Sequence, residues 1–521
     1  MTETTPLFAP DEPIFPRKVK GTFRTLKWII MALTLGIYYL VPWIRWDRGP
    51  NLPDQAVLVD LAGRRFYFYW IEIWPHEFYF VAGLLIMAGL GLFLFTSALG
   101  RVWCGYACPQ TVWTDLFLTV ERWIEGDRNA RVRLWKAPWD ARKTRLRLTK
   151  WTIWILIGMA TGGAWVFYFA DAPTLLVDLL TGNAHPVAYM TVAILTATTV
   201  VLGGFMREQV CIYMCPWPRI QAAMVDEGTL TVGYRDWRGE PRGKKRDEHA
   251  GDCIDCMACV NVCPTGIDIR DGQQMACITC ALCIDACDEV MDKIGRPRGL
   301  IDYLALDDRP PTEPGELAPV RPMGTDAPDV AARTMIADGA PAPAPNAGPV
   351  PLLTQGSRDW QPQPAWKHIF RPRTILYGIA WAAIGIALVV GLFIRPEIDM
   401  TVAPVRNPTF VTLSDGTIRN AYDIRLRNKH GEARAFHLSL TSDTMMRIQL
   451  EGRDTLSVSV PANETYRQRV YVSARPQDPA ASADRTDLRF WVEDLISGER
   501  AHVDTLFFGK ESFDERSHHG P

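Results

Sequence analysis

Two runs of closely spaced cysteines constrain this chain more than any other feature of its sequence. The first run is Cys253-x2-Cys256-x2-Cys259-x3-Cys263-Pro264, and the second is Cys277-x2-Cys280-x2-Cys283-x3-Cys287. Three cysteines at this spacing wrap around one face of a [4Fe–4S] cluster, and the fourth crosses to a neighbouring cluster. The pattern therefore predicts a ferredoxin module with two cubane clusters and an internal repeat of 24 residues.

The crossed arrangement also predicts which cysteines share a cluster. One cluster is expected to take Cys253, Cys256, Cys259 and Cys287, and the other Cys277, Cys280, Cys283 and Cys263. A pair of zinc sites is the competing interpretation, because zinc also takes four thiolates per ion. Zinc sites usually use two C-x2-C pairs, so the third cysteine of each run and the Cys263-Pro264 step favour iron–sulfur clusters. Asp288 stands where ferredoxins often have a second proline, which bears on loop shape more than on ligation.

Apolar segments long enough to cross a membrane lie on either side of these runs. A spanning helix needs about 20 mostly apolar residues. Five stretches meet this length, at about Leu26–Ile44, Phe78–Leu99, Trp151–Ala170, Pro186–Phe205 and Thr374–Ile394. The first has a polar, Pro-containing start and no small-residue cleavage site after it, so it is expected to be an anchor and not a removable signal. Five such segments rarely occur together in a soluble chain, and the sequence predicts a polytopic membrane protein.

The distribution of lysine and arginine predicts the orientation. Four basic residues precede the first span and Lys27 lies in its first turn, and the loop 100–150 carries eleven basic against five acidic residues. The loop 171–185 carries no lysine or arginine, while the loop 45–77 carries four and is a mild exception. The N-terminus and all twelve cysteines are then expected on the cytoplasmic side, and the segment after the fifth span outside. The cytoplasm is reducing, so these cysteine spacings favour metal binding over disulfides.

Opposite charges on two cytoplasmic regions suggest a docking hypothesis. The cluster module is rich in aspartate and glutamate, whereas the loop 100–150 is basic. The module is therefore expected either to dock on that loop or on a basic electron donor, or simply to present a solvated acidic surface. The net charge of the whole chain is only −2, and no field of basic charge indicates nucleic acid.

The remaining four cysteines form a second, repeated motif. Cys104-Gly-Tyr-Ala-Cys108-Pro109 follows the second apolar segment, and Cys211-Ile-Tyr-Met-Cys215-Pro216 follows the fourth. The repeat indicates a duplicated two-helix unit, and repeats in membranes often place a shared site between their halves. Four thiolates at one membrane level suit Cu(I), zinc or an iron–sulfur centre, while a structural, redox-inert pair remains the alternative.

Two histidines stand at matching places in the two halves. His76 and His185 lie near the outer ends of the second and fourth apolar segments. Haem across a membrane usually needs paired histidines, often at two levels, and only one level is present here. Interfacial histidines are therefore expected in preference to haem or quinone ligands.

The C-terminal third of the chain contains no cysteine. Residues 308–365 are rich in Pro, Ala and Gly and are expected to form an extended linker. After the fifth span the residues alternate between apolar and polar, as in Asn420–Asn428, which predicts a half-buried strand. Turns are expected at 414–416 and 429–431. Short strands continue at Arg447–Leu450, Leu456–Val460, Tyr466–Val472, Leu488–Val492 and His502–Phe508. About seven strands in roughly 115 residues suggest an immunoglobulin-like sandwich with a binding or scaffolding role.

The sequence thus predicts a mixed membrane protein with five transmembrane α-helices, a cytoplasmic two-cluster ferredoxin module and a C-terminal immunoglobulin-like β-sandwich. The expected domains are an N-terminal tail at 1–25, a membrane domain with four helices at 26–220, the ferredoxin module at 221–305, a Pro/Ala-rich linker at 306–373, the fifth spanning helix at 374–395 and the outer domain at 396–521.

This combination resembles cytochrome c oxidase accessory proteins of the CcoG/FixG type. The resemblance rests on both C-x3-C-P motifs, the run Cys263–Gly272, the stretch Cys283–Asp288, Gly299-Leu300-Ile301 and the outer sandwich. Membrane ferredoxins of quinol-dehydrogenase type share the C-x3-C-P unit, but the sandwich after the fifth span favours the accessory family. The linker at 308–365 looks like an insertion relative to that family pattern.

The resemblance implies a role in maturing the C-type haem–copper oxidase, through reduction of Cu(II) to Cu(I). Carried over to this chain, two [4Fe–4S] clusters relay electrons, and Cys104, Cys108, Cys211 and Cys215 bind or reduce copper. The implied location is the bacterial inner membrane, with a periplasmic C-terminal domain. The implied partners are copper chaperones or oxidase assembly factors and an unidentified cytoplasmic electron donor, and a homodimer is compatible with the sequence. The alternatives are a quinol-linked electron carrier to a periplasmic reductase and a non-catalytic assembly scaffold.

Overall fold

The chain divides into two compact units, and a computed structural model describes most of each. The described residues are 13–49, 52–245, 250–308, 310, 360, 362–395, 398–429, 431–462 and 464–510. The first unit comprises Met1–Ile44 and Gln55–Leu388, and the second comprises Arg45–Asp54 and Val389–Pro521. The expected linker at 306–373 lies largely outside the described residues.

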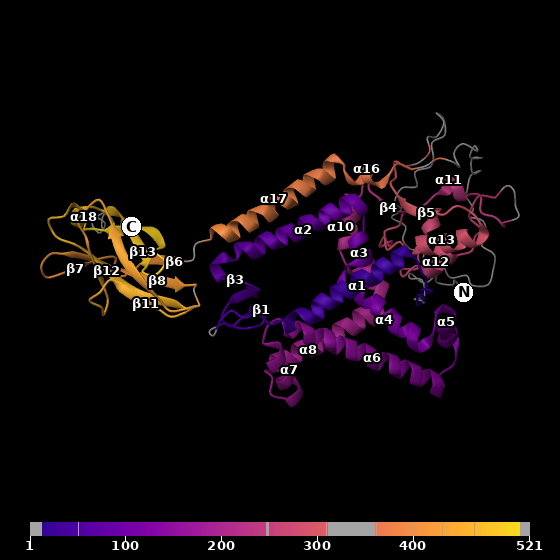
Figure 1. The fold of residues 1–521 in the computed structure, drawn as a ribbon, viewed down its shortest axis with the longest axis horizontal. Coiled ribbons are helices and arrows are strands. Elements are labelled where there is room, and N and C mark those ends of the chain that lie inside the picture. The colour runs from indigo at the N-terminus through magenta and orange to yellow at the C-terminus, as the bar shows by residue number, and fades with distance from the viewer. Residues whose placement is uncertain are drawn as a thin grey trace, which may run out of the picture. The chain divides into compact units, whose positions relative to one another are not determined.

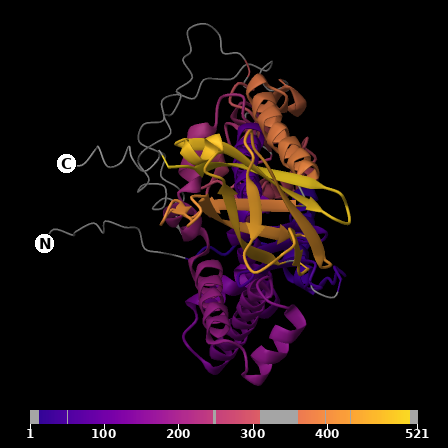
Figure 2. The same ribbon diagram turned by 90° about the vertical axis from the view of Figure 1, so that its left-hand side faces the viewer.

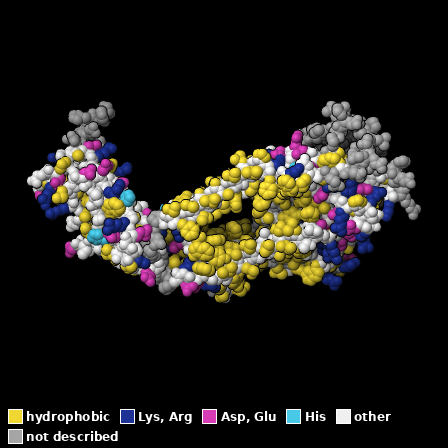
Figure 3. Space-filling model, turned by 45° about the horizontal axis from the view of Figure 1, so that its top comes forward, with side chains coloured by type: hydrophobic (Ala, Val, Ile, Leu, Met, Phe, Trp, Pro, Cys, Tyr) yellow, Lys and Arg dark blue, Asp and Glu magenta, His cyan; other side chains and the backbone are white. Residues whose placement is uncertain are grey.

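Among the residues that the structure describes, four helices are long and apolar enough to cross a membrane. They occupy Thr22–Trp43, Pro75–Leu99, Pro186–Met214 and Pro372–Ile394. The first, second and fourth contain the α-helices α1 (Thr22–Leu40), α2 (Tyr79–Leu99) and α17 (Pro372–Ile394). The third is built from α8 (Pro186–Thr198), a π-helical segment (Thr199–Met206), α9 (Arg207–Gln209) and a second π-helical segment (Val210–Met214). Figure 3 shows hydrophobic side chains covering the surface along this helical body, as expected for helices that contact lipid.

The segment expected as the third span differs from the other four. Helix α6 (Ala141–Val166) covers most of it, but α6 is not among the four membrane-type helices. Lys150 precedes the apolar part, and Trp, Thr and Gly residues between 151 and 166 dilute its apolar character. The helix lies beside α8 (Figure 1), and glycines allow the close approach: a Cβ on Gly162 would stand 2.8 Å from the Val192 carbonyl oxygen.

Short helices connect these long ones and frame the cysteines. They are α3 (Val102–Tyr106), α4 (Pro109–Glu125), α5 (Arg128–Lys136), α7 (Ala172–Thr181), α10 (Trp217–Met224), α11 (Asp236–Gly239), α12 (Ala258–Val262), α13 (Leu282–Ile294) and α16 (Ala365–Ile369). Three-residue 3-10 helices occupy Val41–Trp43, Pro75–Glu77 and Ile269–Asp271. Proline at the first position of α4 suits a helix start, because the first turn has no use for the missing N–H.

Two small antiparallel sheets belong to the first unit. Strands β1 (Val57–Asp60), β2 (Arg65–Phe68) and β3 (Ile71–Ile73) form one sheet in the loop between α1 and α2, which the sequence did not predict. Strands β4 (Thr231–Tyr234) and β5 (Ile301–Leu304) form the other. Since β4 precedes the first cysteine run and β5 follows the second, this pair closes the base of the cluster module.

A buried network of charges binds the basic loop 100–150 together. The Glu121 carboxylate lies 3.0 Å from Arg131 and 3.1 Å from Lys150, and it also pairs with Arg207. These partners come from α5, α6 and α9, so one carboxylate of α4 holds three elements. Some of the basic side chains expected to attract the acidic module are therefore already paired with a buried carboxylate.

The second unit is a β-sandwich. Its strands are β6 (Ile398–Pro404), β7 (Val411–Thr412), β8 (Ile418–Asn428), β9 (Arg434–Thr441), β10 (Arg447–Leu450), β11 (Ser457–Val460), β12 (Thr465–Ala474), β13 (Arg485–Asp494) and β14 (Arg500–Phe508), with the helix α18 (Pro479–Ser482) between β12 and β13. One sheet has the order β10-β12-β8-β6, with β7 also paired to β8, and the other has the order β11-β9-β13-β14. Figure 2 shows the strands of this sandwich facing the viewer.

The core of the sandwich follows from the alternation along its strands. Inward residues of β8 alternate with outward ones, and Tyr422, Phe436, Phe490 and Phe507 are fully buried between the sheets. The Tyr422 hydroxyl donates to the Leu506 carbonyl at 2.8 Å, which satisfies its polar end inside the core. The predicted strands after residue 418 are present, and β6, β7 and β9 add to them. Of the predicted turn at 429–431, His430 lies outside the described residues.

Candidate electron-transfer and metal-binding site

The two cysteine runs adopt the same backbone path. Asp255 and Met257 of the first run have φ values of 55° and 56°, and Thr279 and Ala281 at the equivalent places have 53° and 58°. Left-handed backbone is uncommon outside glycine and is typical of functional loops. Each run then enters a helix at the same point, α12 at Ala258 and α13 at Leu282. The internal repeat seen in the sequence is thus a structural repeat of two curled loops.

A small cavity lies inside these loops. Its walls carry five cysteines, and its remaining lining is mostly apolar. The cysteines are Cys259, Cys263, Cys277, Cys280 and Cys283. The set predicted for one cluster, Cys263 with the first three cysteines of the second run, therefore faces a single cavity.

The four cysteines predicted to hold the other cluster also lie near one another. The Cys287 thiol lies within electrostatic range of Cys259, Cys253 and Cys256, although 28 or more residues separate it from each of them. Burial raises the pKa of the Cys287 thiol above its usual range, and the neighbouring thiols raise it further. Burial likewise raises the pKa of Cys259 and of Cys277 to about 12. Such thiols stay protonated unless a cation displaces the proton.

The donor chemistry fits iron–sulfur clusters. Eight cysteines in two sets converge on these loops, seven of them buried or half-buried and Cys256 exposed, and soft thiolates are the ligands that iron–sulfur clusters require. Tyr234, Ile267, Leu300 and Ile301 pack around the module and keep water from it. When bound, the clusters would supply one-electron transfer at this position.

The four cysteines of the C-x3-C-P motifs come together at the end of the helical body. Cys104 lies in α3, Cys108 is the residue before α4, Cys211 lies in the second π-helical segment and Cys215 ends it. The Cys104 thiol lies within electrostatic range of Cys108 and Cys215, and Cys211 within range of all three others. The duplicated motif therefore forms one cluster of thiols.

Cys104 has the most defined surroundings of the four. Its thiol donates to the Gln221 side-chain oxygen at 3.2 Å, and Arg101 Nε donates to the same oxygen at 3.3 Å. The Gln221 amide in turn donates to the Thr96 hydroxyl at 3.3 Å. Burial raises the pKa of the Cys104 thiol to about 11, and the Arg101 guanidinium opposes this rise. Sequence reasoning missed Gln221, which lies with Arg219 in the short helix α10 and belongs to no motif.

The thiol cluster touches the cluster module directly. Gly105 packs against the second cysteine run so closely that a Cβ there would lie 2.6 Å from the Ile278 carbonyl oxygen and 2.9 Å from Cys280 Cα. The Tyr106 hydroxyl donates to the Cys280 carbonyl at 3.1 Å. Cys104 belongs to the same apolar cluster as Ile278 and Cys280. The C-x3-C-P motif after α2 is therefore seated on the loop that carries three of the predicted cluster ligands.

A second small cavity adjoins this contact. Cys211 lines it together with the charged side chains Lys27, Asp115, Arg122, Arg207 and Glu208. Thr265 and Ile278 line both this cavity and the one inside the cysteine loops. Only a thin wall of side chains thus separates Cys211 from the cluster module.

The two histidines singled out in the sequence have local partners. The His185 ring accepts from the Val187 N–H at 3.3 Å and caps α8. His76 Nε2 lies 3.9 Å from the Glu77 carboxylate. Neither belongs to a group of three metal-type ligand atoms within the part of the chain that the structure describes.

Comparisons with known proteins agree with this arrangement. The profile of a 4Fe-4S dicluster domain matches residues 206–305, and that of a 4Fe-4S binding domain matches residues 80–128. The profile of the immunoglobulin-like fold at the C-terminus of FixG matches residues 388–510. The nitrogen fixation protein FixG of Rhizobium meliloti is 52% identical over 506 residues, which cover 95% of this chain and 92% of that protein.

The chain belongs to the FixG family. Protein RdxB of Cereibacter sphaeroides is 64% identical and protein RdxA of the same organism 59% identical, over 98% and 97% of this chain and 98% and 99% of theirs. As a FixG-type polyferredoxin, the protein is an iron–sulfur electron-transfer protein with 4Fe-4S domains, apolar helices of a membrane protein and an immunoglobulin-like C-terminal domain.

Proposed function

We propose that this FixG-type protein is a membrane-bound cupric reductase. Electrons from a cytoplasmic donor pass through two [4Fe–4S] clusters to the four C-x3-C-P cysteines, where Cu(II) takes up one electron and becomes Cu(I). The Cu(I) serves assembly of the C-type haem–copper cytochrome c oxidase, with copper chaperones or oxidase assembly factors as recipients. One cluster takes Cys253, Cys256, Cys259 and Cys287, and the other Cys263, Cys277, Cys280 and Cys283.

The contact between Gly105, Tyr106 and the second cysteine run is the observation that supports this proposal most strongly. Gly105 is in van der Waals contact with the Cys280 backbone, and the Tyr106 hydroxyl donates a 3.1 Å hydrogen bond to the Cys280 carbonyl. Electron transfer between two centres needs such proximity, and an inert structural pair would not need it. The position of Cys104 in the same apolar cluster as Cys280 adds to this support.

The surroundings of the four thiols suit the reduction of copper. Soft thiolates bind Cu(I) in preference to Cu(II), so they shift the copper couple towards the reduced ion. The raised pKa of Cys104 means that its proton leaves only when a metal ion takes its place. Gln221 holds this sulfur in position, and a small cavity lies beside Cys211.

Five spans are part of the proposal. Helix α6 has 26 residues, which at 1.5 Å per residue is long enough for a bilayer, and its glycines pack it on α8. Five crossings with the basic loops inside put the ferredoxin module in the cytoplasm and the sandwich in the periplasm of a bacterial inner membrane. All twelve cysteines then stay on the reducing side.

A third iron–sulfur centre at the four C-x3-C-P cysteines is a second candidate. The match of residues 80–128 to a 4Fe-4S binding domain includes Cys104 and Cys108, and this match favours it. In that case the thiols would be the last relay before an acceptor and would not bind copper themselves.

One set of variants separates the two candidates. Cys104, Cys108, Cys211 and Cys215 are all replaced by Ser, and the anaerobically purified protein is analysed for iron and examined by EPR. For a copper site, iron stays at about eight atoms per chain and the cluster signals persist, but Cu(I) formation from the reduced protein is lost. A loss of about four iron atoms per chain would support the third cluster instead. Copper reduction at the parent rate would refute the assignment of these cysteines.

A further inference from the structure

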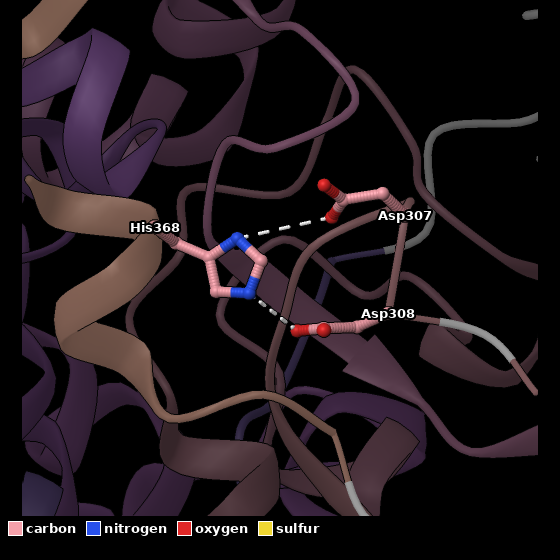
Figure 4. Close-up of side chains that lie close together, drawn as sticks. All are labelled: Asp307, Asp308 and His368. Carbon is pink, nitrogen blue, oxygen red and sulfur yellow. Dashed lines mark ion pairs between the residues drawn. The ribbon is translucent and has the colours of Figure 1, made fainter. Parts of the chain in front are cut away.

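A group of metal-type ligands lies away from the cysteines, between the end of β5 and α16. Asp307 and Asp308 follow β5, and His368 belongs to α16 (Figure 4). One ligand atom from each of the three lies within 4.8 Å of the other two. Within the described residues, this is the one group of three His, Cys, Asp or Glu side chains with such spacing.

Two of these side chains are buried, and one of their polar atoms lacks a hydrogen bond. The side chains of Asp308 and His368 are only 2% and 5% exposed. Asp308 Oδ2 lies 2.9 Å from His368 Nε2, yet Nε2 makes no hydrogen bond, because this oxygen lies off the line of the ring N–H. A buried nitrogen without a partner is costly, so its presence calls for an explanation.

The local charges are also unbalanced. Within the described part of the chain, the ion pairs of Asp307 and Asp308 are both with His368, but with different ring nitrogens: Asp307 Oδ1 lies 3.8 Å from Nδ1 and Asp308 Oδ2 lies 2.9 Å from Nε2. Arg371 is nearby but pairs with Asp226 at 2.6 Å. Asp308 also lies within electrostatic range of Arg235, which itself pairs with Asp302 at 3.1 Å, and the Asp307 side chain is half exposed, so a neutral imidazole would leave the two carboxylates only partly compensated. A divalent cation would neutralise both.

The backbone holds the three residues in place. The Asp307 and Asp308 N–H groups donate to the carbonyls of Glu227 and Ala305, both at 3.1 Å. The Gln363 N–H donates to Asp308 Oδ1 at 3.1 Å, which leaves Oδ2 facing the imidazole. Arg371 Nε donates to the His368 carbonyl at 2.7 Å. The ligand atoms are thus presented by fixed elements.

We propose that Asp307, Asp308 and His368 bind a divalent transition-metal cation. Metal–ligand distances of about 2.0–2.2 Å put neighbouring ligand atoms about 3 Å apart, close to the observed separation of Nε2 and Oδ2. An imidazole beside two carboxylates selects ions such as Zn²⁺ or Cu²⁺ over Mg²⁺ and Ca²⁺. His368 and Asp308 flank the segment 309–367, so the ion closes this loop and holds α16 and the start of α17 against β5. The site is separate from the four C-x3-C-P thiols and does not depend on copper reduction.

The test uses full-length protein in which the four C-x3-C-P cysteines are already Ser, so that their thiols do not contribute. Cu²⁺ binding is followed by EPR with the iron–sulfur clusters oxidised, and Zn²⁺ binding by equilibrium dialysis, each in the presence of excess Mg²⁺. We expect one equivalent of either ion, with hyperfine coupling to one imidazole nitrogen in the Cu²⁺ spectrum. His368→Ala removes this equivalent, and Asp308→Asn weakens binding at least tenfold.

Two controls make the outcome decisive. Asp308→Asn keeps an oxygen that can accept from Gln363, so the fold is retained while the charge is lost. His502→Ala removes an exposed histidine of the sandwich and is expected to bind metal like its parent. Equal binding in the His368, Asp308 and His502 variants, or no binding in their common parent, would overturn the proposal and leave an ion pair of one imidazolium with two carboxylates. Neither result bears on whether the protein reduces copper.

Discussion

Cys104 and Cys108 lie in a short α-helix and at the start of the next one, whereas Cys211 and Cys215 lie in and after a π-helical segment. The tyrosines of the two motifs differ as much: Tyr106 is 4% exposed and Tyr213 is 76% exposed. Gly105 occupies the position that Ile212 has in the second motif. In the first motif, the space that a side chain at position 105 would occupy is filled by the backbone of Ile278 and Cys280.

This difference teaches that duplication fixed the four thiols but not their surroundings. The first motif is seated on the cluster module, while Cys211 of the second lines the cavity with the charged side chains. In the proposed reaction the first pair receives electrons and the second admits the metal ion. Substitutions at equivalent positions of the two motifs should therefore have unequal effects.

The largest expected effect is that of Gly105→Ala. The added methyl would lie 2.6 Å from the Ile278 carbonyl oxygen, so the second cysteine run must move away. We expect single-turnover Cu(I) formation by the reduced protein to fall at least tenfold and the EPR signal of the adjacent cluster to change. Ile212→Ala at the equivalent position should leave both nearly unchanged. Equal losses in the two variants would remove the distinction between the motifs.

A smaller effect is expected for Gln221→Leu. The substitution leaves Arg101 Nε and the Thr96 hydroxyl without their buried partner, which costs about 1–3 kcal/mol. The midpoint temperature for loss of the visible absorbance of the clusters should fall, and Cys104 should react faster with a thiol reagent. Unchanged reactivity of Cys104 would mean that Gln221 does not hold this sulfur.

The smallest effect is expected for Tyr106→Phe. It removes only the hydroxyl group, and with it the hydrogen bond to the Cys280 carbonyl and the interaction with Tyr303, at a cost of about 1 kcal/mol. We expect a lower midpoint temperature and a measurable shift of one cluster potential in redox titration. Tyr213→Phe is the matched control and should change neither quantity, since its side chain is exposed. A potential shift in both variants would argue against a special role of the first motif.

Much of this architecture is encoded in local patterns. The 24-residue repeat of the cysteine runs reappears in the left-handed residues at 255, 257, 279 and 281, because loop shape follows cysteine spacing. The strands of the sandwich follow from the alternation of apolar and polar residues along the sequence, as in β8. Four apolar stretches form membrane-type helices.

The parts that escaped prediction depend on contacts distant in sequence. Gln221 meets Cys104 across 117 residues, and Asp308 meets His368 across a long segment rich in proline and alanine. The π-helical segments have the same apolar pattern as an α-helix, so periodicity could not separate them. In α6, tryptophan, threonine and glycine blur the hydropathy signal on which the prediction of a span relied.

The central claim is that electrons leave the clusters for Cu(II) through the C-x3-C-P thiols. The most direct test mixes the dithionite-reduced, desalted protein with Cu(II) anaerobically and follows cluster oxidation and Cu(I) chelation together. The account predicts that cluster oxidation and Cu(I) formation proceed at the same rate, and that one Cu(I) ion forms for each electron that the clusters lose. In the protein whose four C-x3-C-P cysteines are Ser, the clusters should stay reduced. Cluster oxidation by Cu(II) at the parent rate in that variant would contradict the account.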